Sequence, residues 1–179
     1  MVHMNQNRII EYELLLKLVK NKSHGRALAK ELKIPLTTLQ RALKRLSLIL
    51  EIKIEGKNKI YKIKNNLKAK KYLHNAENYH LLKTIKKYPL LEPILEEIKT
   101  NTLTILFGSY AKHTANKDSD IDIYIETNNK ELKKQIELIN SKINVKIGTF
   151  NPKSLLIKEI IKNHVIIKGV EKYYEHIFE

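Results

Sequence analysis

The chain has 179 residues without cysteine, of which 42% are hydrophobic and 30% are charged. This composition excludes disulfide bonds and thiolate metal sites and is typical of a folded, water-soluble protein. No apolar run approaches the about 18 residues that a membrane span needs, and no signal-peptide pattern is present. We therefore expect a cytoplasmic protein with no membrane partner and with one large or two small domains.

The net charge of +15 lies almost entirely in the first half of the chain. Residues 1–100 hold 22 Lys and Arg against 9 Asp and Glu, whereas residues 101–179 hold 12 against 10. A general enrichment in lysine would raise the net charge of both halves equally. The asymmetry therefore indicates a nucleic-acid-binding module in the first half, joined to a module of another kind.

Three helices are predicted in the first 48 residues. Apolar residues recur at helical spacing over residues 8–21. Ser23 is a candidate N-cap for a second helix, which should end before Pro35 because the residue preceding a proline disfavours the helical conformation. A third helix is predicted over residues 38–48, with polar and mostly basic residues facing outward. A short turn between two such helices is typical of a helix-turn-helix.

Two alternating runs, residues 51–55 and 59–64, bracket a Gly-Lys-Asn turn and predict a β-hairpin whose outward row is largely lysine. Three helices plus a basic hairpin resemble a winged helix-turn-helix domain, which we place at residues 1–66. The resemblance implies that the third helix enters a major groove, with DNA favoured over RNA as the partner. The implied contacts are Thr37, Thr38, Gln40, Arg41 and Lys44 in the groove, with Lys57 and Lys59 on phosphates. Winged helices also serve as dimerisation or protein-binding modules, so a homodimer or another protein partner is the alternative.

Residues 67–100 are predicted to form a helical connector with a break at Tyr88-Pro89. The rest of the chain, residues 101–179, alternates between strands and helices. Strands are predicted at residues 103–107, 121–126, 143–150 and 164–168, and helices from residue 109, at 129–142 and at 152–162. This alternation predicts an α/β layer with helices on one face, and hence an α+β protein of two domains.

The most informative stretch is an apolar strand that breaks at Gly108-Ser109 and is followed, after a polar loop, by Asp120-Ile121-Asp122-Ile123. Because strand side chains alternate between faces, the two aspartates should project from the same side. Adjacent carboxylates are costly unless a cation lies between them, and Mg²⁺ binds carboxylates together with substrate phosphates. The pattern therefore predicts a Mg²⁺ (or Mn²⁺) and nucleotide site.

This stretch resembles the signature of the DNA polymerase β-like nucleotidyltransferases, and in particular of their minimal prokaryotic branch. The matching segments are Gly108-Ser109-Tyr110-Ala111 and Ser119-Asp120-Ile121-Asp122. The resemblance implies a nucleotidyltransferase fold with a mixed sheet, in which the two aspartates hold two Mg²⁺ ions. It further implies that Gly108 and Ser109 cradle the β- and γ-phosphates of a nucleoside triphosphate. It also implies that Lys112 or Lys117 neutralises charge nearby.

The chain departs from this family at two places. Lys112-His113 stands where Arg-Gly is usual, and the third carboxylate that the family generally supplies is absent, because that strand carries Asn144 and Lys146. Glu126 lies about 13 Å along the strand from Asp122, too far to replace it. His113 and His164 are weaker candidates for a general base.

Two functions follow as expectations. The first is a Mg²⁺-dependent nucleotidyltransferase that moves an NMP from an NTP to an unidentified acceptor, with a nucleic-acid-binding winged helix; small members of the family often act with a toxin protein as partner. The second is a DNA-binding regulator or antitoxin that is catalytically weak or inactive and uses the same fold as a nucleotide sensor or scaffold. The aspartate pair favours the first, and the missing third carboxylate favours the second.

Overall fold

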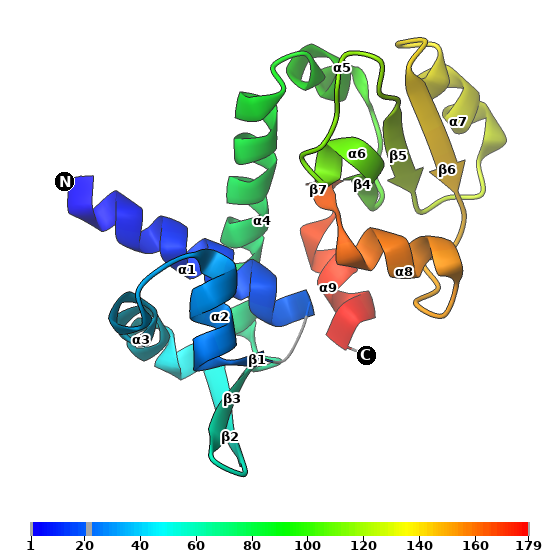
Figure 1. Ribbon diagram of the computed structural model, residues 1–179. Coiled ribbons are helices and arrows are strands. Elements are labelled where there is room, and N and C mark those ends of the chain that lie inside the picture. Colours follow the sequence, from blue (N-terminus) through cyan, green and yellow to red (C-terminus); the bar gives the residue numbers. More distant parts are fainter. Residues whose placement is uncertain (1, 21–22, 179) are drawn as a thin grey trace. The chain divides into compact units, whose positions relative to one another are not determined.

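The computed structural model describes residues 2–20 and 23–178, which form two compact units, one up to Glu77 and one from Asn78. Each unit contains its own β-sheet (Figure 1). The division falls within helix α4 (Leu67–Lys87), and α4 and α5 (Leu91–Glu97) occupy the predicted connector. Among the described residues, none of the helices combines the length and the apolar character needed to cross a membrane.

The first unit begins with three helices, α1 (Val2–Lys20), α2 (Gly25–Leu32) and α3 (Leu36–Arg45). These helices contact one another, and Leu14, Leu39 and Ala42 among their apolar residues are fully buried. Helix α3 starts two residues earlier than predicted, because Pro35 has a φ of −58° and directs the chain into the helix at Leu36. It also ends earlier, and residues 47–49 form a separate 3₁₀ turn.

Helix α2 is bounded by side-chain and backbone caps. At its start the Nδ1 atom of His24 accepts a hydrogen bond from the Ala27 backbone N–H at 3.3 Å. The predicted cap, Ser23, has a side chain that lies outside the described residues. At its end Lys33 adopts a φ of 54°, and the Ile34 N–H donates to the Ala29 carbonyl at 3.1 Å. This left-handed residue stops the helix before Pro35.

Strands β2 (Leu50–Glu55) and β3 (Asn58–Ile63) form the predicted hairpin, and β1 (Ser23–His24) pairs with the other side of β3. The turn is two residues long and starts at Gly56, whose φ of +58° favours glycine. The predicted lysine-rich outward row is only part of the surface. Ile52 and Ile54 are 53% and 75% exposed, because the core of this small unit does not reach the tip of the hairpin.

The second unit is built on a mixed four-stranded sheet, as predicted, in the order β6-β5-β4-β7. Strand β4 (Thr104–Phe107) runs antiparallel to β5 (Ile121–Ile125) and to β7 (Val165–Lys168), whereas β5 and β6 (Ile143–Ile147) are parallel. The connecting helices are α6 (Gly108–Ala111), α7 (Lys130–Glu137), α8 (Leu155–Lys162) and α9 (Val170–Phe178). Helix α7 begins after its N-cap, Asn129, and ends at Glu137, five residues before the predicted end. Strand β6 is also shorter than predicted, since Gly148 follows it.

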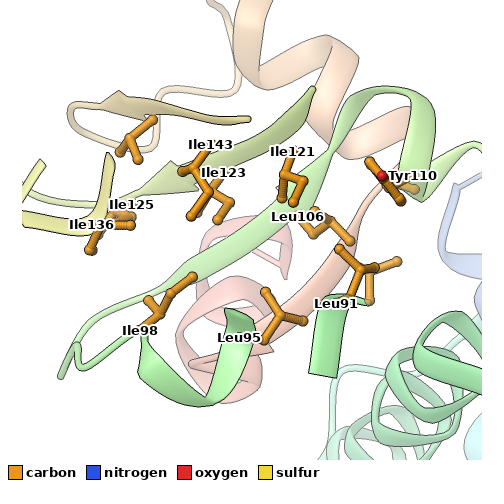
Figure 2. Packing of buried hydrophobic residues seen from close by; sticks show 13 residues of the cluster. Leu91, Leu95, Ile98, Leu106, Tyr110, Ile121, Ile123, Ile125, Ile136 and Ile143 are labelled. Carbon is orange, nitrogen blue, oxygen red and sulfur yellow. The ribbon is translucent and has the colours of Figure 1, made fainter. Parts of the chain in front are cut away.

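One face of this sheet carries an apolar cluster of buried residues. Ile121, Ile123 and Ile125 of β5 are fully buried and lie beside Leu106, Val145 and Val165 of the neighbouring strands. Figure 2 shows Leu91, Leu95 and Ile98, from α5 and the residue that follows it, pointing at these strands. This face fixes β5 in the sheet and leaves residues 120, 122 and 124 on the other side.

The opposite face is also covered, so the prediction of helices on one face is wrong. Ile105 of β4 lies beside Tyr124 and Ile166, and all three are buried. The ring of Tyr124 contacts Phe150 edge-on, and Phe150 in turn contacts Tyr173 of α9. The apolar end of this face is buried by α9. Its other end is polar and carries Asp122.

Glu126, which follows β5, binds α9 through its carboxylate. The carboxylate accepts hydrogen bonds from the His176 Nε2 at 3.0 and 3.2 Å and lies 3.0 Å from the Lys172 Nζ. Burial acts to raise the pKa of Glu126, but the hydrogen bonds and charges of Lys172 and His176 outweigh burial and hold the pKa below its ordinary value. The ionised form is therefore the one that stabilises the fold.

We expect Glu126→Gln to lower the free energy of unfolding by about 1–3 kcal/mol at pH 7, because the ammonium and imidazole lose a charged acceptor. A carboxyl whose pKa is lower in the folded than in the unfolded protein stabilises above its ordinary pKa of 4.5 and stops doing so as the pH falls through the folded value. Urea denaturation of both proteins should therefore show a difference that shrinks between pH 7 and about pH 3. A difference independent of pH would assign the effect to packing.

Candidate functional site

The Gly108-Ser109 step lies where β4 ends and the short helix α6 begins. Gly108 has a φ of +68°, a conformation that residues with a side chain rarely adopt. The Ser109 side chain is half-buried, and within the part of the chain that the structure describes its hydroxyl makes no hydrogen bond. The Ser109 carbonyl accepts from the Thr114 N–H at 3.0 Å and so holds the start of the following loop.

Gly108 lies directly against the carboxylate of Asp122. Phe107 pairs with Asp122 across β4 and β5, which brings the next residue of β4 beside the Asp122 side chain. A Cβ atom on Gly108 would overlap the Oδ2 atom of Asp122 and lie 3.1 Å from its Cγ. Both the backbone conformation and the space therefore require glycine here, and the glycine and the aspartate form one site.

Asp120 directly precedes β5 and Asp122 is its second residue, so the alternation of the strand predicts both side chains on the same side of the sheet. Asp120 is exposed just before the strand, whereas Asp122 is half-buried within it. Burial raises the pKa of Asp122, and the charge of Asp120 adds to this effect. A hydrogen bond from Asn144 and the charges of Lys146 and Lys112 act in the opposite direction without cancelling it.

Asn144 occupies the position opposite Asp122 on the neighbouring strand. The two residues pair across the parallel strands β5 and β6, and the Asn144 Nδ2 donates to the Asp122 Oδ1 at 3.0 Å. Lys146 pairs with Tyr124 and is exposed. In the family that the sequence resembles, this strand carries the third carboxylate. Here β6 instead supplies an amide donor and an ammonium group beside the aspartate pair.

Of the two lysines predicted to neutralise phosphate charge, Lys112 is already paired. Its Nζ lies 2.7 Å from the Oε1 of Glu159 on α8, and this contact lowers the pKa of Glu159. Lys117 lies exposed in the loop before β5, and its carbonyl accepts from the Lys142 ammonium. Glu159 was not predicted as a site residue, because it lies about fifty positions away and only the packing of α8 brings it to Lys112.

The two histidine candidates are engaged in packing. His113 adopts a φ of 58°, which explains why glycine is usual at this position in the family that the sequence resembles. Its ring stacks on those of His80 and Tyr88, with centroids 5.8 and 6.3 Å apart, and its carbonyl accepts from the Lys87 Nζ at 2.6 Å. His164 is 2% exposed, and its Nδ1 lies 3.1 Å from the Ile160 carbonyl at the end of α8.

The donor set around Asp122 fits a divalent cation that shares its coordination with a ligand. Among the described residues there is no cluster of three or more His, Cys, Asp or Glu side chains that could hold a metal ion by itself. Two carboxylates on one side of a strand match Mg²⁺, which takes one or two carboxylates and completes its shell with water and substrate phosphates. The site therefore fits a metal that arrives with a nucleotide.

In the first unit the predicted nucleic-acid contacts lie on two elements. On α3, Thr37, Gln40, Arg41 and Lys44 are exposed, and Thr38 is half-buried. On the hairpin, Lys57 in the turn and Lys59 at the start of β3 are exposed. All of these side chains except Thr38 are thus available to a partner.

Comparisons with known proteins bear on the second unit. Residues 90–168 match the family model described as a nucleotidyltransferase domain. No curated protein matches the chain, and no solved structure does. The matched segment begins just before α5 and ends with β7, so it contains the whole four-stranded sheet together with Gly108, Asp120 and Asp122. The part of the chain that holds the candidate site therefore has a nucleotidyltransferase fold.

Proposed function

We propose that the second unit transfers an NMP from an NTP to an acceptor in a reaction that depends on Mg²⁺ or Mn²⁺. The observation that carries this proposal is the approach of Gly108 to the Asp122 carboxylate, together with the match to a nucleotidyltransferase domain. A glycine beside a metal-binding carboxylate leaves space in which a triphosphate can bind the metal.

In this proposal Asp120 and Asp122 hold the metal, and the Ser109 hydroxyl is a donor for phosphate oxygens. The metal supplies charge neutralisation on the triphosphate and lowers the pKa of the attacking hydroxyl. Lys117 is exposed near the start of the strand and can neutralise further charge. Lys112 can turn from Glu159 toward a phosphate, since both side chains are about 40% exposed and the exchange of ion pairs costs little.

The direct experiment is incubation of the protein with each NTP, labelled at the α-phosphate, in the presence of Mg²⁺ or Mn²⁺. Label should appear on the protein itself, on a partner protein, on RNA or on a small acceptor, and label at the γ-position should not be transferred. Asp122→Asn serves as the inactive control. Label transfer that persists in this control would assign the activity to another site or to a contaminant.

A second candidate function is a regulator or antitoxin that binds nucleotide but turns it over weakly or not at all. The hydrogen bond from Asn144 to Asp122 favours it, because the strand that carries Asn144 and Lys146 is the one on which the family has a third carboxylate that helps to activate the nucleophile. In that case the nucleotide would act as an effector, and a toxin protein would be the partner. Binding of Mg-NTP without any label transfer, with all acceptor classes tested, would support this function over the first.

Restoring the third carboxylate distinguishes the two functions. We expect Asn144→Asp to create or raise transferase activity about tenfold or more if the rest of the site is competent, since one extra ligand strengthens metal binding. Without metal the variant should be less stable than the parent, because it places a new charge beside Asp122. Thermal denaturation with and without Mg²⁺ should then show a larger stabilisation by metal than in the parent. Asn140→Asp, outside the sheet, is the matched control.

We also propose that the first unit is a winged helix-turn-helix that binds nucleic acid, with DNA favoured over RNA. The exposed polar face of α3 and the lysines of the hairpin support this function, together with the excess of basic residues in the first half of the chain. Side chains on a recognition helix reach base edges, whereas lysines of a wing contact phosphates.

For nucleic-acid binding we expect different responses at the two elements. In anisotropy titrations of the full chain, Lys57→Ala should weaken all duplexes alike and flatten the slope of log affinity against log salt by about 0.9, the value for one phosphate contact. Arg41→Ala should instead reduce the preference between sequences. Lys130→Ala, an exposed lysine of the second unit, is the control for loss of charge alone. Equal effects of all three substitutions would indicate nonspecific attraction.

A further inference from the structure

The hairpin carries an apolar row that extends beyond the core of the first unit. Leu50 and Ile63 pair at the base of the hairpin and are 4% and 3% exposed, whereas Ile52 and Ile54 follow on the same face and are 53% and 75% exposed. Two large aliphatic side chains in adjacent positions of one face form an exposed apolar patch, which is unusual on a hairpin otherwise rich in lysine. The patch indicates a contact with protein on this side of the hairpin.

Strand β2 also has a free edge. In the sheet order β1-β3-β2 it is terminal, and among the described residues β3 is its only paired neighbour. The Lys64 N–H donates to the Ile49 carbonyl at 2.9 Å, and hydrogen-bonded pairs alternate along an antiparallel ladder. Odd-numbered residues of β2 therefore bond to β3, and the N–H and C=O groups of Leu50, Ile52 and Ile54 point to the open side. Such an edge can accept another strand.

The charges of β2 match those of the same strand in antiparallel orientation. Glu51, Lys53 and Glu55 alternate along its second face. If two copies pair about Ile52, each Glu51 lies opposite Lys53 of the partner subunit, and each Leu50 lies opposite Ile54 of the partner subunit. Pairing about Lys53 would instead place lysine against lysine and glutamate against glutamate, which is unfavourable. The strand is thus self-complementary in one register that also uses its free N–H and C=O groups.

We propose that two copies of this chain associate through antiparallel pairing of their β2 strands, centred on Ile52. The two-fold arrangement makes every contact twice, as expected of a symmetric dimer. It joins the two hairpin sheets into one and covers part of the exposed apolar row. The contact is small, about five residues from each copy, so the expected dissociation constant is micromolar rather than nanomolar.

The test is sedimentation of the nuclease-treated full-length protein at concentrations from about 1 to 500 µM, a range that brackets a micromolar association. Glu51→Lys and Lys53→Glu should each weaken dimerisation about tenfold or more, because each creates two like-charge pairs across the two-fold axis. The double substitution Glu51→Lys with Lys53→Glu should restore it, since the pairs are then attractive again. Lys130→Glu, in the second unit, is the control for a change of net charge.

A second variant separates edge pairing from packing. Ile52→Pro removes an N–H that points to the free side while leaving the hydrogen bonds to β3 in place, so the protein should stay folded and become monomeric. Ile52→Val, which keeps the N–H, should stay dimeric. A protein that is monomeric over the whole range, or that loses its dimer on nuclease treatment, would overturn the proposal. A dimer that survives Ile52→Pro, or a double swap that fails to restore association, would overturn the β2 register.

Discussion

Replacement of Asp122 by asparagine should abolish the Mg²⁺-dependent tightening of nucleotide binding and lower the transfer rate about 100-fold or more. The reason is the loss of a charged metal ligand, because a bound metal supplies several kcal/mol of charge stabilisation and each 1.36 kcal/mol changes the rate tenfold. The asparagine has the same shape, and its carbonyl oxygen can still accept the hydrogen bond from Asn144.

The same substitution should not destabilise the fold. The pKa of Asp122 is raised in the folded protein, chiefly by burial, so the ionised carboxylate opposes folding at neutral pH. A neutral side chain removes that cost, and the free energy of unfolding at pH 7 should be equal to or higher than that of the parent. Function and stability should therefore move in opposite directions, as expected for a residue kept for its chemistry.

Titration calorimetry with ATP, with and without Mg²⁺, measures the effect on binding, and urea denaturation measures stability. Asp118→Asn is the matched control, because Asp118 is exposed and its backbone N–H is fixed by the Asn116 side chain in the loop before Asp120. Asp120→Asn should resemble Asp122→Asn in binding. If Asp122→Asn bound Mg-ATP as tightly as Asp118→Asn, the metal site would lie elsewhere.

Gly108→Ala should cause a loss of transfer activity as large as that of Asp122→Asn. The new methyl group would overlap the Asp122 carboxylate and turn it away from the metal position. It would also occupy space next to the triphosphate. The positive φ of Gly108 adds a backbone cost of about 1–2 kcal/mol, which a domain of ordinary stability tolerates.

Gly56→Ala provides a close control for this prediction. Gly56 has a φ of +58°, similar to that of Gly108, but no atom lies within 4 Å of the position of its Cβ. Gly56→Ala should show the backbone cost alone in urea, and Gly108→Ala that cost plus the cost of displacing the Asp122 carboxylate, while nucleotide binding and transfer should be lost only in Gly108→Ala. A Gly108→Ala protein with the activity of the parent would remove the observation on which the proposed function rests.

Features that depend only on residues close together in the sequence could be predicted before the structure was known. The alternation of Asp120-Ile121-Asp122-Ile123 predicted which side chains enter the core, and Ile121 and Ile123 are indeed fully buried. The strands of the second half and the β-hairpin with its turn at a glycine were also predictable, because strand period and glycine conformation are local properties. A resemblance over about twenty residues identified the same fold that the family model finds over residues 90–168.

Tertiary structure alone decided which distant groups surround the aspartate pair. The strand register places the Asn144 amide on Asp122, and the packing of α8 places Glu159 on Lys112. No local pattern encodes either contact, since each depends on how separate elements align across a sheet. The exposure of Ile52 and Ile54 likewise depends on how far the core of the first unit extends, because an alternating strand looks the same whether its apolar face is covered or open.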